Sequence, residues 1–377
     1  MKNYIFTIAL SFCATAAAAQ HCHIEANLTI ADDTLYIVNQ KNYRKDTITA
    51  SKGKFTLDIP VSGPQEITIS AIPFPMPSDK RVIRFVAMPD EQMRITGDYA
   101  YNEISGSRFY EEYAKMRWMT QALENRNNVN IEWGNQLHAN KVTHDSISSI
   151  FHTIRKANAT LMQEASERYM LLHPDEECSA LLFENIRDVY LARKCYNALS
   201  QRVRSGRMGK VMEKYLTHVD KEIARLERAK EIQPGKYAPT FSLRDLDGKM
   251  LHLEKLRGKW LVLDFWGSWC FWCINGIPQM RQYYEKYRDK FEILSIDCYD
   301  KAEAWKTAVA INQMPWLHVT DPSPSNATGV EQANGIAFRY AIAGFPTKII
   351  IRPDGIIDRV FVGEKEDFYI YLDTLFQ

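Results

Sequence analysis

The fold is decided by residues 260–273, which run Trp260-Leu261-Val262-Leu263-Asp264-Phe265-Trp266-Gly267-Ser268-Trp269-Cys270-Phe271-Trp272-Cys273. The first half is an apolar run with a single acid, the pattern of a buried strand. The two cysteines stand at the start of a predicted helix, which continues through Ile277-Pro278-Gln279-Met280. At a spacing of three, both sulfurs lie on one face of the first helical turn, with Cα atoms roughly 5–6 Å apart, as a disulfide requires.

The position of these cysteines at a helix start favours redox chemistry. The N-terminus of a helix presents unpaired N–H groups and a partial positive charge, which stabilise a thiolate relative to a thiol. A purely structural disulfide and one half of a zinc site are the alternatives. Zinc would need a second ligand pair at similar spacing, which the sequence lacks, so we predict a redox-active dithiol and no metal.

The first nineteen residues have the pattern of a secretory signal peptide, with Lys2 before an apolar stretch at 4–13 and alanines at 16–19 before Gln20. The apolar stretch is too short to span a bilayer comfortably, and an uncleaved anchor is the alternative. No later window is apolar enough to cross a membrane, so we expect no integral membrane segment in the mature chain. Because an exported disulfide persists in an oxidising compartment, we predict the periplasm.

Composition limits the classes of function. The 377 residues suggest two or three domains, and Lys+Arg 47 against Asp+Glu 46 gives a net charge of +1. That balance provides no electrostatic reason to expect nucleic acid as a partner. After removal of the signal peptide, six cysteines remain, too few for a disulfide-stapled scaffold: Cys22, Cys178, Cys195, Cys270, Cys273 and Cys298.

Three segments follow the predicted signal peptide. Residues 20–107 contain short alternating runs separated by Gly, Pro and Asp turns, which predicts a small antiparallel β domain resembling a sandwich. Residues 108–232 have apolar residues at three- and four-residue steps, which predicts four or five helices with Trp118 and Trp133 as packing residues. Residues 233–377 begin with a Pro- and Gly-containing linker and then alternate strands with helices, which predicts a mixed sheet flanked by helices.

The last segment contains motifs in a recognisable order: Gly235-x-x-Ala238-Pro239, Asp247-Gly248-Lys249, Leu263-Asp264-Phe265-Trp266, Trp269-Cys270-x-x-Cys273, Pro278, Gly344-Phe345-Pro346-Thr347 and Asp354-Gly355. With these motifs the segment resembles the TlpA/ResA-like family of exported thiol–disulfide oxidoreductases. The resemblance implies an α/β thioredoxin fold without a cofactor, which reduces disulfides of envelope proteins and is re-reduced by an upstream thiol electron donor. Residues 20–232 more loosely resemble the N-terminal extension of Bacteroidetes envelope proteins of this type.

The resemblance assigns roles to individual residues. Cys270 would attack a substrate disulfide, and Cys273 would resolve the mixed disulfide. Pro346 would form a cis bond that faces the disulfide and would aim the Phe345 backbone at an extended substrate. Asp264 occupies the family position of a buried carboxylate beneath the disulfide. It would exchange a proton with Cys273, provided that burial raises its pKa.

Aromatic residues and two departures from the family pattern mark the surroundings of the cysteines. Trp269 would pack beside the first cysteine and shape the rim of the site. Phe271 and Trp272 replace the Gly-Pro or x-Pro dipeptide of the family and would add an apolar surface for substrate. The family often has an acid before the helix proline, where this chain has Gly276, so we expect proton handling to depend on Asp264.

Each remaining cysteine has two interpretations. Cys298 is either an ordinary semi-buried thiol or a third redox cysteine, and Cys178 and Cys195 are either free thiols or a stabilising pair. We expect Cys22 to lie in a disordered tail, His21-Cys22-His23, rather than in a metal site.

Two other functions stay open from the sequence. The protein could be an envelope docking module that has a thioredoxin fold and little turnover. A thiol peroxidase shares the fold, but it needs a threonine three residues before the reactive cysteine, where Gly267 stands.

Overall fold

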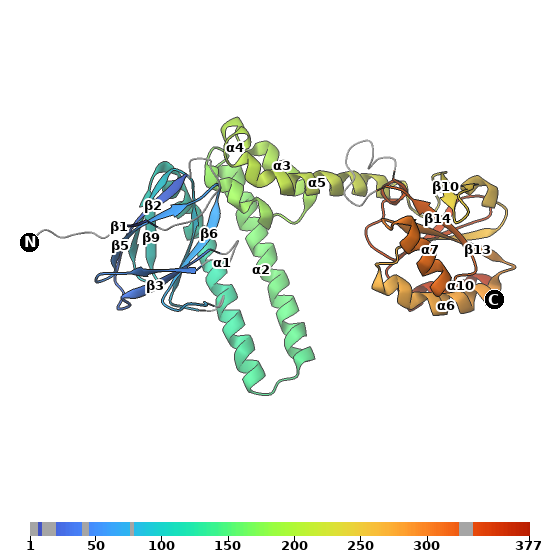
Figure 1. Ribbon diagram of the computed structural model, residues 1–377, viewed down its shortest axis with the longest axis horizontal. Helices are drawn as coiled ribbons and strands as arrows, with labels where there is room; N and C mark the ends of the chain where they lie inside the picture. Colours follow the sequence, from blue (N-terminus) through green and yellow to red (C-terminus); the bar gives the residue numbers. More distant parts are fainter. Residues whose placement is uncertain (1–6, 10–19, 40–44, 76–78, 324–334) are drawn as a thin grey trace, which may run out of the picture. The chain divides into compact units, whose positions relative to one another are not determined.

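The computed structural model describes residues 7–9, 20–39, 45–75, 79–323 and 335–377. The chain divides into two compact units, Met1–Asp220 and Lys221–Gln377 (Figure 1). Most of the predicted signal peptide lies outside the described residues, and Thr7–Ala9 forms the short strand β1. No helix in the described ranges is both long enough and apolar enough to cross a bilayer.

The first unit begins with two β-sheets. Their strands, beyond β1, are β2 (His21–Leu28), β3 (Thr34–Asn39), β4 (Lys45–Thr49), β5 (Lys54–Pro60), β6 (Gln65–Ser70), β7 (Val82–Ala87), β8 (Glu91–Gly97) and β9 (Asn102–Gly106). One sheet has the order β4-β3-β6-β7 and is antiparallel throughout. The other has the order β1-β5-β2-β8-β9 and contains two parallel pairs, β1–β5 and β2–β8. The predicted small antiparallel domain is confirmed, with these parallel pairs as an addition.

The expectation of a disordered tail at residues 21–23 is wrong. These residues begin β2, which lies between β5 and β8 in its sheet. Apolar side chains at every second position from Cys22 to Leu28 face the core, and Cys22 has no exposed surface. The buried face of this alternating strand offsets the entropic cost of ordering the segment.

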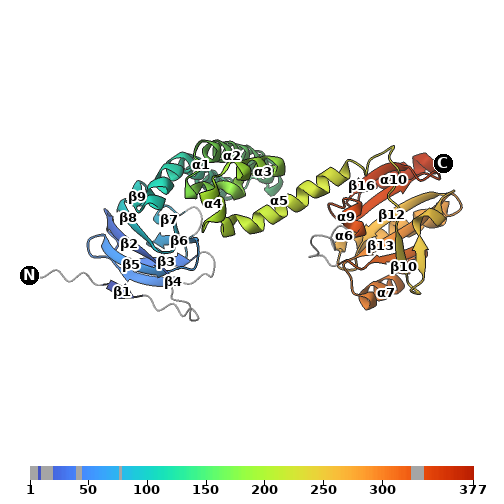
Figure 2. The ribbon, with the colours of Figure 1, turned by 90° about the horizontal axis from the view of Figure 1, so that it is seen from above.

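Helices complete the first unit: α1 (Arg108–Ala139), α2 (His144–Leu172), the 3-10 helix η1 (Glu177–Asn185), α3 (Val189–Ala198), α4 (Gln201–Ser205) and the start of α5 (Gly209–Ala229). The segment is helical, as predicted. α1 begins directly after β9 (Figure 2) and is held to the sheets by Tyr110. The Tyr110 hydroxyl donates to the Val86 carbonyl at 3.0 Å and accepts from the Met88 N–H at 3.1 Å.

The two tryptophans of α1 differ from the sequence expectation. Trp118 is 83% exposed, so its prediction as a packing residue is wrong. Trp133 contacts Phe151 of α2 with ring centroids 5.5 Å apart, yet it is still 40% exposed. Both residues lie on the antiparallel hairpin of α1 and α2 (Figure 1), where each helix covers only one side of its neighbour.

The second unit is built on one sheet of seven strands: β10 (Ser242–Asp245), β11 (Met250–His252), β12 (Trp260–Trp266), β13 (Phe291–Cys298), β14 (Leu317–Asp321), β15 (Thr347–Ile351) and β16 (Ile357–Val362). Their order is β11-β10-β14-β13-β12-β15-β16. β12, β13 and β14 are parallel, and the other pairs are antiparallel. The helical elements are η2 (Leu253–Leu256), α6 (Phe271–Tyr287), α7 (Ala302–Ile311), α9 (Ile336–Arg339) and α10 (Glu366–Phe376).

Strand β12 separates two apolar cores. Leu261, Leu263 and Phe265 face one core, which includes Ile336 of α9. Val262 and Trp266 face the other core, together with residues of α6 and α10 and both cysteines. α6 and α10 lie side by side over this second face (Figure 1), where Tyr283 donates to Asp373 at 2.9 Å. A mixed sheet with helices on both faces confirms the predicted α/β thioredoxin fold.

Candidate redox site

Cys270 and Cys273 form a disulfide at the start of α6, with Cα atoms 5.2 Å apart. The separation expected from the sequence is confirmed. Cys270 is the N-cap residue of α6, and its Sγ accepts a hydrogen bond from the Cys273 backbone N–H at 3.2 Å. When the disulfide is reduced, this N–H and the helix N-terminus stabilise the Cys270 thiolate relative to the thiol.

Exposed aromatic side chains surround the disulfide. Cys270 and Cys273 are 6% and 5% exposed, whereas Trp269, Phe271 and Trp272 are 53%, 67% and 63% exposed. The rings of Phe271 and Trp272 meet edge to face, with centroids 5.4 Å apart. We call Trp269, Phe271 and Trp272 the aromatic rim. Large apolar side chains that stay exposed in a group are typical of a surface that binds another molecule.

Trp269 links the cysteines to the loop that contains Pro346. The indole N–H donates to the Cys298 carbonyl at 3.1 Å, and the ring meets Phe345 edge to face at 5.2 Å. Gly267 leaves room for this indole, because a Cβ at position 267 would lie 2.4 Å from its Nε1. The Phe345–Pro346 bond is cis, as the resemblance implied. The Pro346 loop therefore lies beside the residue that precedes the disulfide.

Asp264 lies on the face of β12 that packs against α6. Its alternate neighbours Val262 and Trp266 belong to the same apolar cluster as both cysteines. Ser295 donates to Asp264 Oδ2 at 2.9 Å. Burial raises the pKa of Asp264, while the Lys348 ammonium and the Ser295 hydrogen bond lower it. The condition on which its expected role depended, a pKa raised by burial, is fulfilled.

Sequence reasoning missed a buried ion pair next to Asp264. Lys348 is 2% exposed, and its Nζ donates to Glu364 Oε2 at 2.5 Å. Lys348 lies directly opposite Asp264 across the antiparallel β12–β15 pair. The Tyr369 hydroxyl donates to Glu364 Oε1 at 2.6 Å. The sequence contained one signal, a lysine inside the apolar run 347–351, because lysine is rarely buried without a partner.

Four described cysteines outside the disulfide are free and buried: Cys22, Cys178, Cys195 and Cys298. Cys178 and Cys195 are not joined, so the interpretation as a stabilising pair is wrong. Burial raises the pKa of Cys178 to about 12 and that of Cys195 to about 11. Burial also raises the pKa of Cys298 well above its ordinary value, which favours the interpretation as an ordinary buried thiol.

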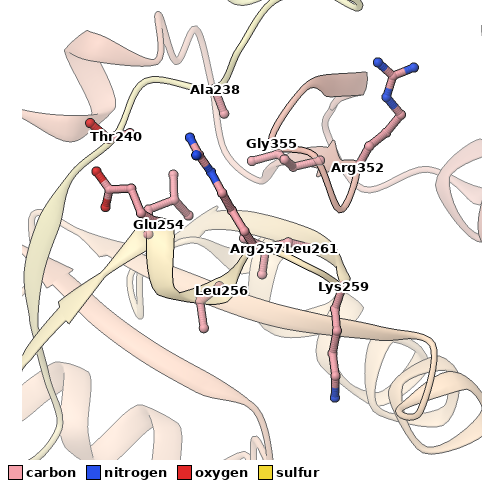
Figure 3. A pocket seen from close by; sticks show the side chains of 11 residues that line it. Ala238, Thr240, Glu254, Leu256, Arg257, Lys259, Leu261, Arg352 and Gly355 are labelled. Carbon is pink, nitrogen blue, oxygen red and sulfur yellow. The ribbon is translucent and has the colours of Figure 1, made fainter.

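Among the hollows in the described part of the second unit, one is lined by neighbours of the cysteines in the chain and another lies farther away. Figure 3 shows the more distant one, where Arg257 points between Glu254 and Gly355. Its lining includes Leu261 near the start of β12, whereas the cysteines follow the end of that strand. The other hollow is lined by Ser268, Ile274 and residues of α7 and its C-cap: Glu303, Ala304, Thr307, Ala308, Ile311 and Asn312. In the part of the chain that the structure describes, no cluster of His, Cys, Asp and Glu is arranged to hold a metal ion.

Comparison with known proteins places the second unit in a family. Residues 234–360 match the family model described as AhpC/TSA family. The chain is 31% identical over 148 residues to a thiol-disulfide oxidoreductase ResA of Bacillus cereus, and 32% identical to ResA of Bacillus anthracis. Each alignment covers 38% of this chain and 80% of the relative.

Solved structures of similar proteins include two from Bacteroides species. The thioredoxin domain of a thiol-disulfide oxidoreductase from Bacteroides vulgatus is 25% identical, with a TM-score of 0.34, and the match covers 38% of this chain and 99% of that one. A thiol-disulfide oxidoreductase from Bacteroides fragilis is 29% identical, with a TM-score of 0.33, over 37% of this chain and 99% of that one. The ResA alignments span most of each relative, and the second unit has the thioredoxin fold with a disulfide at the start of α6. The chain therefore belongs to the TlpA/ResA-like family of thioredoxin-fold thiol–disulfide oxidoreductases.

Proposed function

We propose that this protein is an exported enzyme that reduces disulfide bonds of envelope proteins through Cys270 and Cys273. The observation that carries the proposal is the disulfide at the N-cap of α6, next to an exposed aromatic rim and on the side of the sheet that carries the buried Asp264. A helix N-terminus favours the thiolate that attacks, and the aromatic rim favours contact with an apolar segment of another protein.

The reaction is a two-step thiol–disulfide exchange. The Cys270 thiolate attacks one substrate sulfur, which forms a mixed disulfide and releases the other substrate sulfur as a thiolate. Cys273 then passes its proton to the Asp264 carboxylate and attacks Sγ of Cys270. This step closes the Cys270–Cys273 disulfide and releases the second substrate sulfur, which takes the proton from Asp264. The substrate gains two electrons, and an upstream dithiol returns two electrons to the enzyme by the same exchange in reverse.

Substrate would bind over the aromatic rim and along the loop at Pro346. The backbone of Phe345 precedes the cis bond and is available for strand-like pairing with an extended peptide. The hollow beside Ser268 and Ile274 offers a mostly apolar wall next to the same cysteines. Apolar side chains that flank a substrate cysteine would therefore improve binding.

Export and the periplasmic location rest on the predicted signal peptide before Gln20. A dithiol that works in an oxidising compartment needs a continuous supply of electrons, so an upstream thiol donor is part of the proposal. Expression with the natural N-terminus and mass spectrometry of the periplasmic fraction tests this part. A mature chain that begins near Gln20 supports export, and a full-length cytoplasmic chain contradicts it.

The decisive experiment measures insulin reduction and then traps the substrate. Cys270→Ser abolishes activity, because no attacking thiolate remains. Cys273→Ala lets the mixed disulfide form but removes the resolving thiol, so substrate proteins stay covalently attached and can be identified. Cys195→Ala, a buried thiol of the first unit, serves as the matched control and keeps full activity. Full activity of Cys270→Ser would rule out this mechanism.

Two competing functions predict other outcomes. If the protein is mainly an envelope docking module, a Cys270→Ser/Cys273→Ser double variant still restores the phenotype of a deletion strain. If it is a thiol peroxidase, purified reduced protein consumes hydrogen peroxide at a catalytic rate. The structure gives no support to the peroxidase, because a threonine side chain at Gly267 would collide with the Trp269 indole.

A further inference from the structure

One buried ion pair of the redox unit has no role in the proposed reaction. Lys348 and Glu364 form an ion pair whose side chains are 2% and 15% exposed. A charged pair is costly to bury, and removal of one partner leaves an uncompensated charge. The pair lies in the redox unit, next to the carboxylate that would take the Cys273 proton, which calls for a functional explanation.

The sheet register fixes the position of Lys348. Asp264 has two direct neighbours across β12, Ser295 on β13 and Lys348 on β15. Directly opposite residues of an antiparallel pair have their side chains on the same face, with Cβ atoms about 4.5–5.5 Å apart. The Lys348 side chain therefore lies on the α6 side of the sheet with Asp264, and its ammonium pairs with Glu364.

Glu364 is held against the active-site helix. A Cβ at Gly276 would lie 2.4 Å from Glu364 Cδ, so the carboxylate occupies the space that a side chain at position 276 would take. Tyr369 donates to Glu364 at 2.6 Å and to the Gly276 carbonyl at 3.3 Å. Gly276 follows Cys273 by three residues, which puts both on the same face of α6, one turn apart. The absence of a side chain at position 276 is thus what admits a carboxylate from outside the helix.

We propose that Glu364 is a positioning residue for Asp264. Glu364 holds the Lys348 ammonium on the Asp264 side of the sheet, and it links the buried site to solvent while Cys273 resolves the mixed disulfide. The inference rests on the proposed function, because Asp264 needs a proton route only if Cys273 resolves a mixed disulfide. Asp264 is 2% exposed, whereas Glu364 reaches the surface. Lys348 acts on Asp264 through its charge, and its ion-pair partner Glu364 extends this charged group from the buried carboxylate toward water.

The charges around Asp264 give opposite expectations for two variants. The titratable and polar groups near it are Ser295 and Lys348 on the flanking strands, Glu364 before α10, Tyr369 on α10 and Cys273 on α6. Lys348 lowers the pKa of Asp264 and Glu364 raises it. Glu364→Gln should therefore lower this pKa, and Lys348→Met should raise it. A structural ion pair with no influence on Asp264 would produce neither shift.

The experiment titrates Asp264 directly in the full-length protein. Selective ¹³C labelling of aspartate, with Asp264→Asn to assign the resonance, reports the pKa in the disulfide form, where the active-site thiols do not titrate. We expect shifts of about one pH unit or more in opposite directions, a tenfold change in proton affinity. Gly276→Ala, whose methyl group displaces the Glu364 carboxylate without changing any charge, should shift the pKa in the same direction as Glu364→Gln. Glu366→Gln, an exposed neighbouring acid hydrogen-bonded to Gln279, is the control and should cause no shift.

A second measurement separates this inference from the proposed function. The acidic limb of the pH profile for insulin reduction should move with the Asp264 pKa in each variant, because the base must be ionised to accept the Cys273 proton. Shifts in the same direction for Glu364→Gln and Lys348→Met, or no shift in either, overturn the inference even if insulin is reduced. Opposite shifts without any reductase activity support the charge coupling and overturn the proposed function. If Lys348→Met does not fold, equal pKa values in wild type, Glu364→Gln and Gly276→Ala overturn the inference by themselves.

Discussion

Cysteines occur in both units of the chain, but their surroundings differ. In the first unit, Cys22 is fully buried and its thiol contacts the Tyr110 hydroxyl at 3.2 Å, within a neutral network that also includes Met88. In the second unit, Cys270 and Cys273 lie at a helix N-terminus beside exposed aromatic rings. Burial raises the pKa of Cys22, which keeps that thiol protonated, whereas the helix end stabilises a thiolate. The residue type is the same, and the environment decides its chemistry.

The polar groups around Cys22 and those near the disulfide differ in the same way. The Tyr110 network of the first unit is neutral, and each hydroxyl or N–H in it has a partner. The second unit buries ionisable groups on the side of the sheet that also carries the disulfide, among them Asp264 and Lys348. Neutral hydrogen-bonded groups stabilise a fold without titrating near neutral pH, while paired buried charges respond to pH and to each other. We therefore expect the groups near the disulfide, and not the Tyr110 network, to respond to pH.

The largest expected difference between the units is in thiol reactivity. In the reduced native protein at pH 8, iodoacetamide should label Cys270 at least about 10³-fold faster than Cys178, because a pKa of about 12 leaves very little thiolate. Mass spectrometry of the labelled peptides over time measures both rates. In guanidinium chloride all cysteines should react at similar rates, and equal rates in the native protein would remove the contrast between the units.

Two carboxylates, one in each unit, should change the stability of the protein with pH in opposite directions. Burial, and next a hydrogen bond with Asp300, raise the pKa of Asp297 to about 8. A raised pKa means that its stabilising contribution is present below about pH 4 and is lost as pH rises to about 8. Asparagine stays neutral, so Asp297→Asn should gain roughly 2–4 kcal/mol of unfolding free energy relative to wild type between pH 5 and pH 8.

Asp175 of the first unit should have the opposite effect on stability as the pH changes. Hydrogen bonds from Ser200 and Arg202 lower its pKa, so its contribution is present above about pH 4 and is lost as pH falls. Asp175→Asn should be less stable than wild type at pH 7, and the difference should shrink below pH 4. Guanidinium unfolding of both variants at several pH values measures these trends. If the difference in unfolding free energy between each variant and wild type did not change with pH, the pKa shifts assigned to Asp297 and Asp175 would be wrong.

Helical glycines test how tightly each unit is packed. Gly276→Ala places a methyl group 2.4 Å from the Glu364 carboxyl carbon and should lower the unfolding free energy by roughly 1–3 kcal/mol. Gly134→Ala in α1 meets only the ring of Phe151 at 3.1 Å. Since that ring can shift, the helix propensity of alanine should dominate and raise stability by up to about 1 kcal/mol. Thermal unfolding shows whether each variant is more or less stable than wild type. If both variants were stabilised, the close contact at Gly276 would be in doubt.

The smallest expected effect distinguishes exposed tryptophans. Trp272→Ala and Trp118→Ala should each leave the unfolding free energy within about 0.5 kcal/mol of wild type, since both side chains are exposed. Trp272→Ala should raise KM for insulin roughly fivefold, the loss of about 1 kcal/mol of binding, and leave the turnover of a small aromatic disulfide unchanged. Trp118→Ala should change neither value. Steady-state kinetics with both substrates measures these values. If Trp272→Ala also left KM for insulin unchanged, the aromatic rim would not bind substrate.

Local patterns predicted most elements of the second unit. The apolar run at 260–266 forms β12, the cysteines stand at the start of α6, and the cis bond at Pro346 follows from family resemblance. The sequence interpretation failed where a short segment depended on distant partners. Residues 21–23 contain two histidines and one cysteine, a weak strand signal, and they are ordered only because β5 and β8 pair with them.

The amino-acid sequence by itself determined the strand, the helix and the two sulfurs at its start, because these depend on neighbours within a few residues. Only the tertiary structure brought Asp264, Lys348 and Glu364 to the same side of the sheet, against α6. Their meeting depends on the register of β12 against β15 and on the open space at Gly276, into which Glu364 fits. Register and close packing are properties of the assembled sheet and helices, and no local pattern of residues encodes them.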